Sequence, residues 1–65
     1  MNDAKKKDLI NEKGDLDSKR KIIKDLLLSD AYMGLPNEEQ VLIMKQEVAM
    51  NTYSQILKER ISLIK

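Results

Sequence analysis

Cysteine and histidine are absent from the 65 residues of the chain, and its only aromatic residues are two tyrosines. The lack of cysteine excludes disulfides, and the lack of both residue types removes the usual ligands of a structural zinc ion. It also removes the commonest general base and the most reactive covalent nucleophile. Gly14 and Gly34 stand alone, so the chain has no glycine-rich phosphate loop. We therefore expect no enzymatic activity, no metal and no cofactor.

Length and charge balance narrow the class of protein further. One core rarely stabilises a domain below about 70–80 residues, so a chain without disulfides or a metal is expected to oligomerise. The net charge of +1 does not favour binding to long DNA or RNA. No apolar run has the length of a membrane span or the form of a signal core. We expect an intracellular protein with no membrane association.

The second half of the chain predicts one long helix over residues 37–64. Its apolar residues recur every seven positions in two adjacent rows. The first row is Leu42, Ala49, Ile56 and Leu63, and the second is Ile43, Met50, Leu57 and Ile64. Asn37 and Gln40 match a capping box, and Pro36 discourages helical geometry just before it. A band of two rows is wider than the seam of a two-stranded coiled coil, which favours assembly with further helices.

The first half predicts another helix over residues 4–28. An apolar row with the same period supports it: Leu9, Leu16 and Ile23. Gly14 weakens this helix by about 1 kcal/mol relative to alanine and favours a bend or fraying N-terminal to it. Glu12 and Lys19 fall between the apolar residues of the row. Either they control the register or line a wet pocket, or they lie at the rim of the seam and reach solvent.

Residues 29–36 predict the connection between the two helices. Gly34 can take a left-handed conformation, and Pro36 stops any continuation of a helix. Tyr32 and Met33 are expected to cover the open end of the structure. Two long helices joined by so short a segment most simply fold back antiparallel. The predicted fold class is therefore all-α: a single two-helix antiparallel hairpin domain that assembles into a compact helical homo-oligomer.

Several residues are candidates for binding a ligand that carries phosphate and a flat ring. Lys19, Arg20 and Lys24 lie close together in the first predicted helix, and the last two are one turn apart. Tyr53 and Arg60 lie seven residues apart along the edge of the apolar band, where a ring and a guanidinium suit a base and a phosphate. Composition alone also allows another interpretation, in which the ring of Tyr53 lies in the core with its hydroxyl in contact with water, and the lysine and arginine side chains are exposed to solvent.

One longer pattern, LPNEEQ…LIMKQ…AMNTYSQILKERI, resembles the small phage hairpin domain shared by the anti-CBASS and anti-Thoeris nucleotide sponges. The resemblance covers most of the chain. In the second predicted helix it rests on Leu35, Pro36, Glu38, Glu39, Gln40, Leu42, Gln46, Ala49, Met50, Tyr53, Leu57, Arg60 and Ile61. In the first it is looser and rests on Glu12, Asp15, Leu16, Lys19, Ile23 and Leu27. The pattern is specific for the family but not for one ligand.

The resemblance implies sequestration without catalysis. Such sponges assemble as homo-oligomers, typically hexamers, and bind cyclic di- or trinucleotide second messengers between subunits. By trapping the messenger in the cytoplasm of the host bacterium, they keep a defence effector from being activated. Lys19 matches a basic position that the resemblance implies as a phosphate partner. Residues 4–7 lack the tyrosine with which some sponges stack a base, so the identity of the bound nucleotide stays open.

Two other functions stay open. A structural or adaptor hairpin could use the same apolar face to bind another protein. A basic helix pair that binds nucleic acid is the weaker alternative, because acidic residues interrupt the basic run and dilute its field. These residues are Glu12, Asp15, Asp17 and Asp25.

Overall fold

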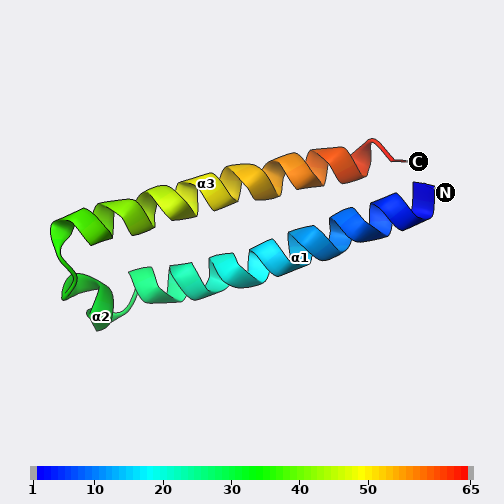
Figure 1. Ribbon diagram of the computed structural model, residues 1–65. Coiled ribbons are helices and arrows are strands. Elements are labelled where there is room, and N and C mark those ends of the chain that lie inside the picture. Colours follow the sequence, from blue (N-terminus) through cyan, green and yellow to red (C-terminus); the bar gives the residue numbers. More distant parts are fainter. Residues whose placement is uncertain (1, 65) are drawn as a thin grey trace.

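The computed structural model describes residues 2–64, and all secondary structure in that range is helical. Helix α1 (Asn2–Leu27) is followed by the single turn α2 (Asp30–Met33) and by α3 (Asn37–Ser62). The two long helices lie side by side and antiparallel, so the described chain ends meet at one end of the molecule and α2 lies at the other (Figure 1). The predicted all-α class is confirmed.

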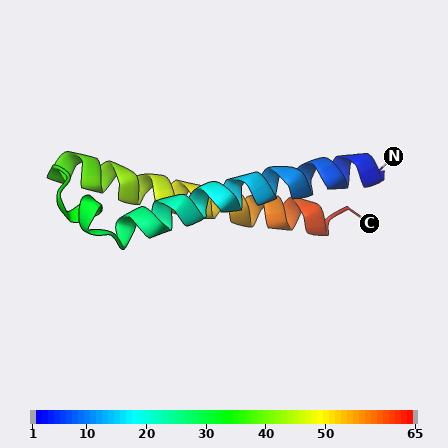
Figure 2. The same cartoon turned by 90° about the horizontal axis from the view of Figure 1, so that it is seen from below.

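The hairpin is elongated. It measures 49 × 14 × 12 Å, and its radius of gyration of 14.9 Å exceeds the roughly 11 Å expected for a compact domain of this length. Seen from below, α1 and α3 cross at a shallow angle (Figure 2). No helix within residues 2–64 is both long and apolar enough to cross a bilayer. In this shape each long helix covers only one stripe of the other.

That stripe is where the core lies. Leu9 and Leu16 of α1 pack with Leu57 of α3, which is fully buried. Partly buried residues complete the cluster: Met50 and Ile61 of α3, and Ile64 just after its end. The second predicted row of α3 therefore faces α1. The first row is turned to the side of this contact and stays open, with Leu42 62% exposed and Leu63 80% exposed.

The connection differs in three respects from the one predicted. It contains a helical turn, α2, rather than only a loop. Gly34 has an ordinary right-handed conformation (φ −83°), so the turn needs no left-handed residue. Tyr32 is buried and its hydroxyl donates to the carbonyl of Gln40 at 3.1 Å, as a cover for the open end requires. Met33 is 74% exposed and does not share that role.

The start of α3 also corrects the sequence analysis. Pro36, not Asn37, occupies the cap position, and no side chain caps the helix there. Gln40 reaches back instead, donating from Nε2 to the carbonyl of Leu35 at 2.9 Å. This bond fastens the connection onto the first turn of α3. The fraying expected N-terminal to Gly14 is likewise wrong, because α1 begins at Asn2 and runs through Gly14 without interruption.

Burial of Leu57 provides a direct test of this core. Leu57→Ala removes a fully buried side chain and should lower the free energy of unfolding by about 2–5 kcal/mol. Leu28→Ala is the matched control, because Leu28 is 88% exposed and its truncation should change stability by less than about 0.5 kcal/mol. Urea denaturation followed by circular dichroism at one fixed protein concentration measures both. Equal effects of the two substitutions would contradict the observed packing.

Candidate functional site

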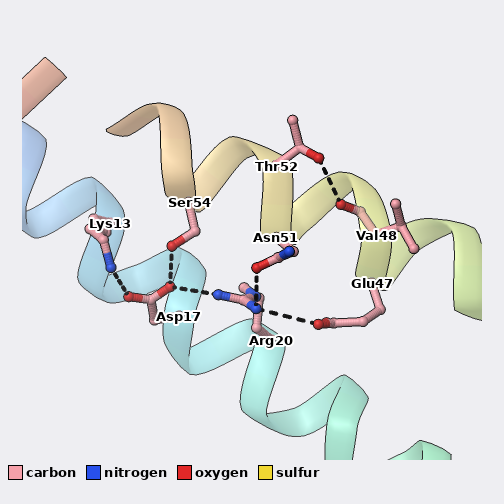
Figure 3. A network of polar contacts seen from close by, with 8 residues as sticks. All are labelled: Lys13, Asp17, Arg20, Glu47, Val48, Asn51, Thr52 and Ser54. Atoms are coloured by element: carbon pink, nitrogen blue, oxygen red, sulfur yellow. Dashed lines mark hydrogen bonds and ion pairs between the residues drawn. The ribbon is translucent and has the colours of Figure 1, made fainter. Parts of the chain in front are cut away.

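The contact between α1 and α3 is polar near its middle. Arg20 of α1 donates from Nη2 to Oδ1 of Asn51 at 2.8 Å, and the same nitrogen lies 3.4 Å from Oε1 of Glu47 (Figure 3). Both acceptors belong to α3. The Arg20 and Glu47 side chains are only 15% and 17% exposed, so this ion pair is largely screened from water. A single guanidinium thus joins the two long helices.

Asp17 forms the other half of the network. Its carboxylate accepts hydrogen bonds from Lys13 Nζ at 2.6 Å and from Ser54 Oγ at 2.7 Å, and Arg20 Nη1 lies 3.5 Å away. The bond from Lys13 is the main cause that holds the pKa of Asp17 below its ordinary value, and the bond from Ser54 acts in the same direction. Partial desolvation opposes them. We call the whole set the polar seam: Lys13, Asp17, Arg20, Glu47, Asn51 and Ser54.

The polar seam is incompletely satisfied. Within the part of the chain that the structure describes, Nε of Arg20 and Oε2 of Glu47 are buried without a hydrogen-bond partner. Buried polar atoms left in this way cost desolvation energy, so the ion pair adds little net stability. It does discriminate between registers, because sliding α1 by one turn would part Arg20 from Glu47 and Asn51. We infer that the polar seam sets how the two helices align.

These contacts also show which side chains share an edge of the hairpin. We call a residue of α1 or α3 a contact residue when it faces the other long helix. The residue that follows it in sequence is turned about 100° around the helix axis in one direction, and the residue that precedes it is turned about 100° in the other direction. Asp17 follows Leu16, and Asn51 follows Met50. Because Arg20 bonds to both Asp17 and Asn51, residues that follow contact residues lie on the same edge. Residues that precede them therefore share the opposite edge.

The five residues predicted to bind ligand divide accordingly. Lys19 precedes a contact residue of α1, and Tyr53 and Arg60 precede contact residues of α3, so these three share what we call the Lys19 edge. All three are exposed, and Tyr53 at 41% is not a core residue. Lys24 follows a contact residue and lies on the opposite edge. Arg20 lies in the polar seam, where both of its terminal nitrogens, Nη1 and Nη2, are engaged. The assignment of each as a ligand-binding residue stays a prediction.

The polar seam was not predicted from the sequence, because the apolar row of α1 was assigned a register in which Glu12 and Lys19, rather than Lys13 and Arg20, lie between its members. Glu12 and Lys19 are exposed, so the interpretation that they reach solvent at the rim is confirmed. Lys13 takes the place predicted for Glu12, and Arg20 takes the place predicted for Lys19. The row of α1 that faces α3 is therefore Leu9, Lys13, Leu16, Arg20, Ile23 and Leu27. A signal for this register was present in the sequence. Arg20 of α1 and Glu47 of α3 carry opposite charges, and each is spaced by seven residues from other members of the row that faces the partner helix.

The face of α3 that points away from α1 is unusually apolar. Its exposed large side chains are Val41, Leu42, Met44, Val48, Ile56 and Leu63. A shallow hollow of about 480 Å³ lies among them, lined by Val41, Met44, Lys45, Val48 and Ala49. All of its lining comes from one helix, so it is a space between side chains that a neighbouring helix could fill rather than an enclosed pocket. In residues 2–64 no group of acidic side chains is arranged to hold a metal ion.

The lowered pKa of Asp17 predicts a pH-dependent contribution to stability. Since the folded-state pKa lies below the unfolded one, the charge stabilises the fold above about pH 3.9, and the contribution is lost as the pH falls through the folded-state value. Asp17→Asn should therefore lower the free energy of unfolding by about 0.5–1 kcal/mol at pH 7. The difference from the unsubstituted protein should vanish in acid.

The same denaturation series with Asp25→Asn supplies the control, because Asp25 is exposed and lies outside the polar seam. A difference between Asp17→Asn and the unsubstituted protein that stays constant from pH 7 down to about pH 2 would show that the Asp17 charge makes no specific contact.

Comparison with known proteins identifies a family. The family model described as Sequestin, a name that denotes sequestration, matches residues 3–63. No curated protein and no solved structure matches the chain. The matched range takes in nearly all of both long helices, the whole polar seam and the Lys19 edge. The chain therefore belongs to the Sequestin family.

Proposed function

We propose that this chain is a phage anti-defence sponge of the anti-CBASS and anti-Thoeris type. It assembles with its own copies, as a hexamer, and binds cyclic di- or trinucleotide second messengers in the cytoplasm of the host bacterium. It does not hydrolyse them, and it blocks an immune effector by removing the messenger. The observation that carries the proposal is the Sequestin match along almost the entire chain, which points to a sequestering role.

The exposed apolar face of α3 supports self-assembly. A small soluble monomer rarely leaves so many large aliphatic side chains of one helix open to water. Among residues 3–64, only Leu9, Leu16, Tyr32 and Leu57 are buried hydrophobic residues, which is a small core for a stable single copy. Further copies that cover α3 would supply the missing core.

The Lys19 edge supports a nucleotide as the ligand. It presents an ammonium, a half-exposed ring and a guanidinium on the same side of the hairpin, and these groups suit phosphates and bases. One copy offers only an open edge, whereas a pocket needs walls on several sides. Copies related by symmetry would repeat these groups around a closed ligand.

An adaptor that binds another protein is the second candidate. The same apolar face, with its hollow at Val41, Met44 and Val48, would accept a helix of a different chain. Native mass spectrometry separates the two functions when the protein is mixed with a panel of cyclic di- and trinucleotides and cyclic ADP-ribose isomers. A homo-oligomer that retains unmodified ligand at fixed stoichiometry supports the sponge. An oligomer that retains none of the panel favours the adaptor.

Charge reversal at Lys19 tests the site. Lys19→Glu should weaken nucleotide binding about 100-fold or more, since it replaces a phosphate partner by a like charge, while the oligomer persists. Lys21→Glu makes the same change of net charge at an exposed lysine on the opposite edge, and should leave affinity within about threefold. Isothermal calorimetry gives the affinities and light scattering the mass. Equal affinity of the two variants would reject Lys19 as a phosphate partner.

A further inference from the structure

One row of α3 is complementary to itself in an antiparallel arrangement. Leu42, Ala49, Ile56 and Leu63 are exposed, and each immediately precedes a buried or half-buried residue. Three of these following residues, Met50, Leu57 and Ile64, belong to the core cluster shared with α1. The row is therefore turned about 100° from the α1 contact and points to the same side as the Lys19 edge. We infer that this row pairs with the same row of a second copy, antiparallel, across a two-fold axis near Thr52.

Spacing along the helix supports that register. When Leu42 faces Leu63 of the second copy, Ala49 is level with Ile56 of that copy, and the two-fold repeats both contacts. In the middle of the contact the small side chain of Ala49 packs against the larger one of Ile56, and at the ends Leu42 packs against Leu63. This alternation of size lets the side chains of the two helices interdigitate. A self-complementary contact of this kind is what a two-fold interface requires.

Charge supports the same register independently. Lys45, Thr52 and Glu59 follow one another at intervals of seven on the border of the row away from α1, and all three are exposed. Neither Lys45 nor Glu59 makes an ion pair with any residue in the range 3–64. In the antiparallel register, Lys45 and Glu59 of the second copy are offset along the helix axis by about the rise of one residue. The two-fold axis repeats this ion pair, so it occurs twice in the dimer. A parallel pairing would instead align like charges.

This pairing deepens the proposed function and rests on the self-assembly it requires. Because the row and the Lys19 edge lie on the same side of the hairpin, both copies turn their Lys19 edges toward the space between the two α1 helices. Tyr53 is adjacent to Thr52, so the two Tyr53 rings stand beside the axis. The ligand site is then built by two copies, with Tyr53 next to the axis and Lys19 on each wall. A single hairpin holds half of it.

Cysteine cross-linking tests the axis directly. The chain has no cysteine of its own, so Thr52→Cys introduces a single thiol. At the axis the two Cα atoms fall within the roughly 4–7 Å that a disulfide spans. Mild oxidation should convert most of the full-length Thr52→Cys protein into a covalent dimer on a non-reducing gel. Asp25→Cys, on the exposed face of α1 away from α3, should stay monomeric on the gel. Failure of Thr52→Cys to cross-link, with the helical spectrum intact, would overturn the pairing.

Charge exchange tests the register. Lys45→Glu and Glu59→Lys should each raise the dissociation constant of self-association at least tenfold, because each places like charges opposite one another twice. The double variant, and an equimolar mixture of the two single variants, restore opposite charges and should return the dissociation constant to within about threefold of the original. Sedimentation velocity measures all four samples. Single variants that associate normally, or a double variant that does not recover, would contradict the inferred register.

Nucleotide binding to the same variants keeps this inference separate from the proposed function. Cross-linked Thr52→Cys that binds no cyclic nucleotide of the panel would support the pairing and reject the sponge. An assembly that binds nucleotide but neither cross-links at Thr52 nor responds to the charge exchange would support the sponge and reject the pairing.

Discussion

Two helices packed side by side can each bury only one stripe, and this limit governs the whole molecule. Helix α3 carries two adjacent apolar rows, but α1 covers only the one that contains Leu57. The neighbouring row from Leu42 to Leu63 stays in water. The hairpin measures 49 × 14 × 12 Å, and side-by-side packing of its two long helices leaves one row of α3 uncovered. In the proposed function, further copies of the chain cover the second row.

The polar seam acts on alignment rather than on net stability. Leucines and isoleucines spaced by seven residues pack almost equally well after a slip of one heptad, so they define the register weakly. Arg20 bonds to Asn51 and pairs with Glu47 in one alignment only, and Ser54 reaches the carboxylate of Asp17 in that same alignment. Because Arg20 Nε and Glu47 Oε2 lack partners among the described residues, a better-satisfied apolar pair would be more stable but less selective.

The period of seven in the sequence was sufficient to predict both long helices and their antiparallel return. It could not decide between the two rows of α3, since both are apolar and only contact with α1 distinguishes them. Nor could it place the polar residues of α1, because Glu12 and Lys19 repeat with the same period as Lys13 and Arg20. That choice depends on Glu47 across the seam. The common edge of Lys19 and Tyr53 likewise follows from the pairing of two helices, which no single helix reveals.

A sponge acts by binding alone, so it needs complementarity to the messenger itself rather than to a transition state. A cyclic oligonucleotide is already closed and loses little internal freedom on binding, which favours tight capture by fixed groups. In the proposed pair, Tyr53 and Lys19 from two copies complete the site, so the ligand binds the assembly and not the separate hairpin. Mass action then couples the two events, because a ligand that binds only the assembled form stabilises it. Capture of the messenger would strengthen the same α3 contact that forms the site.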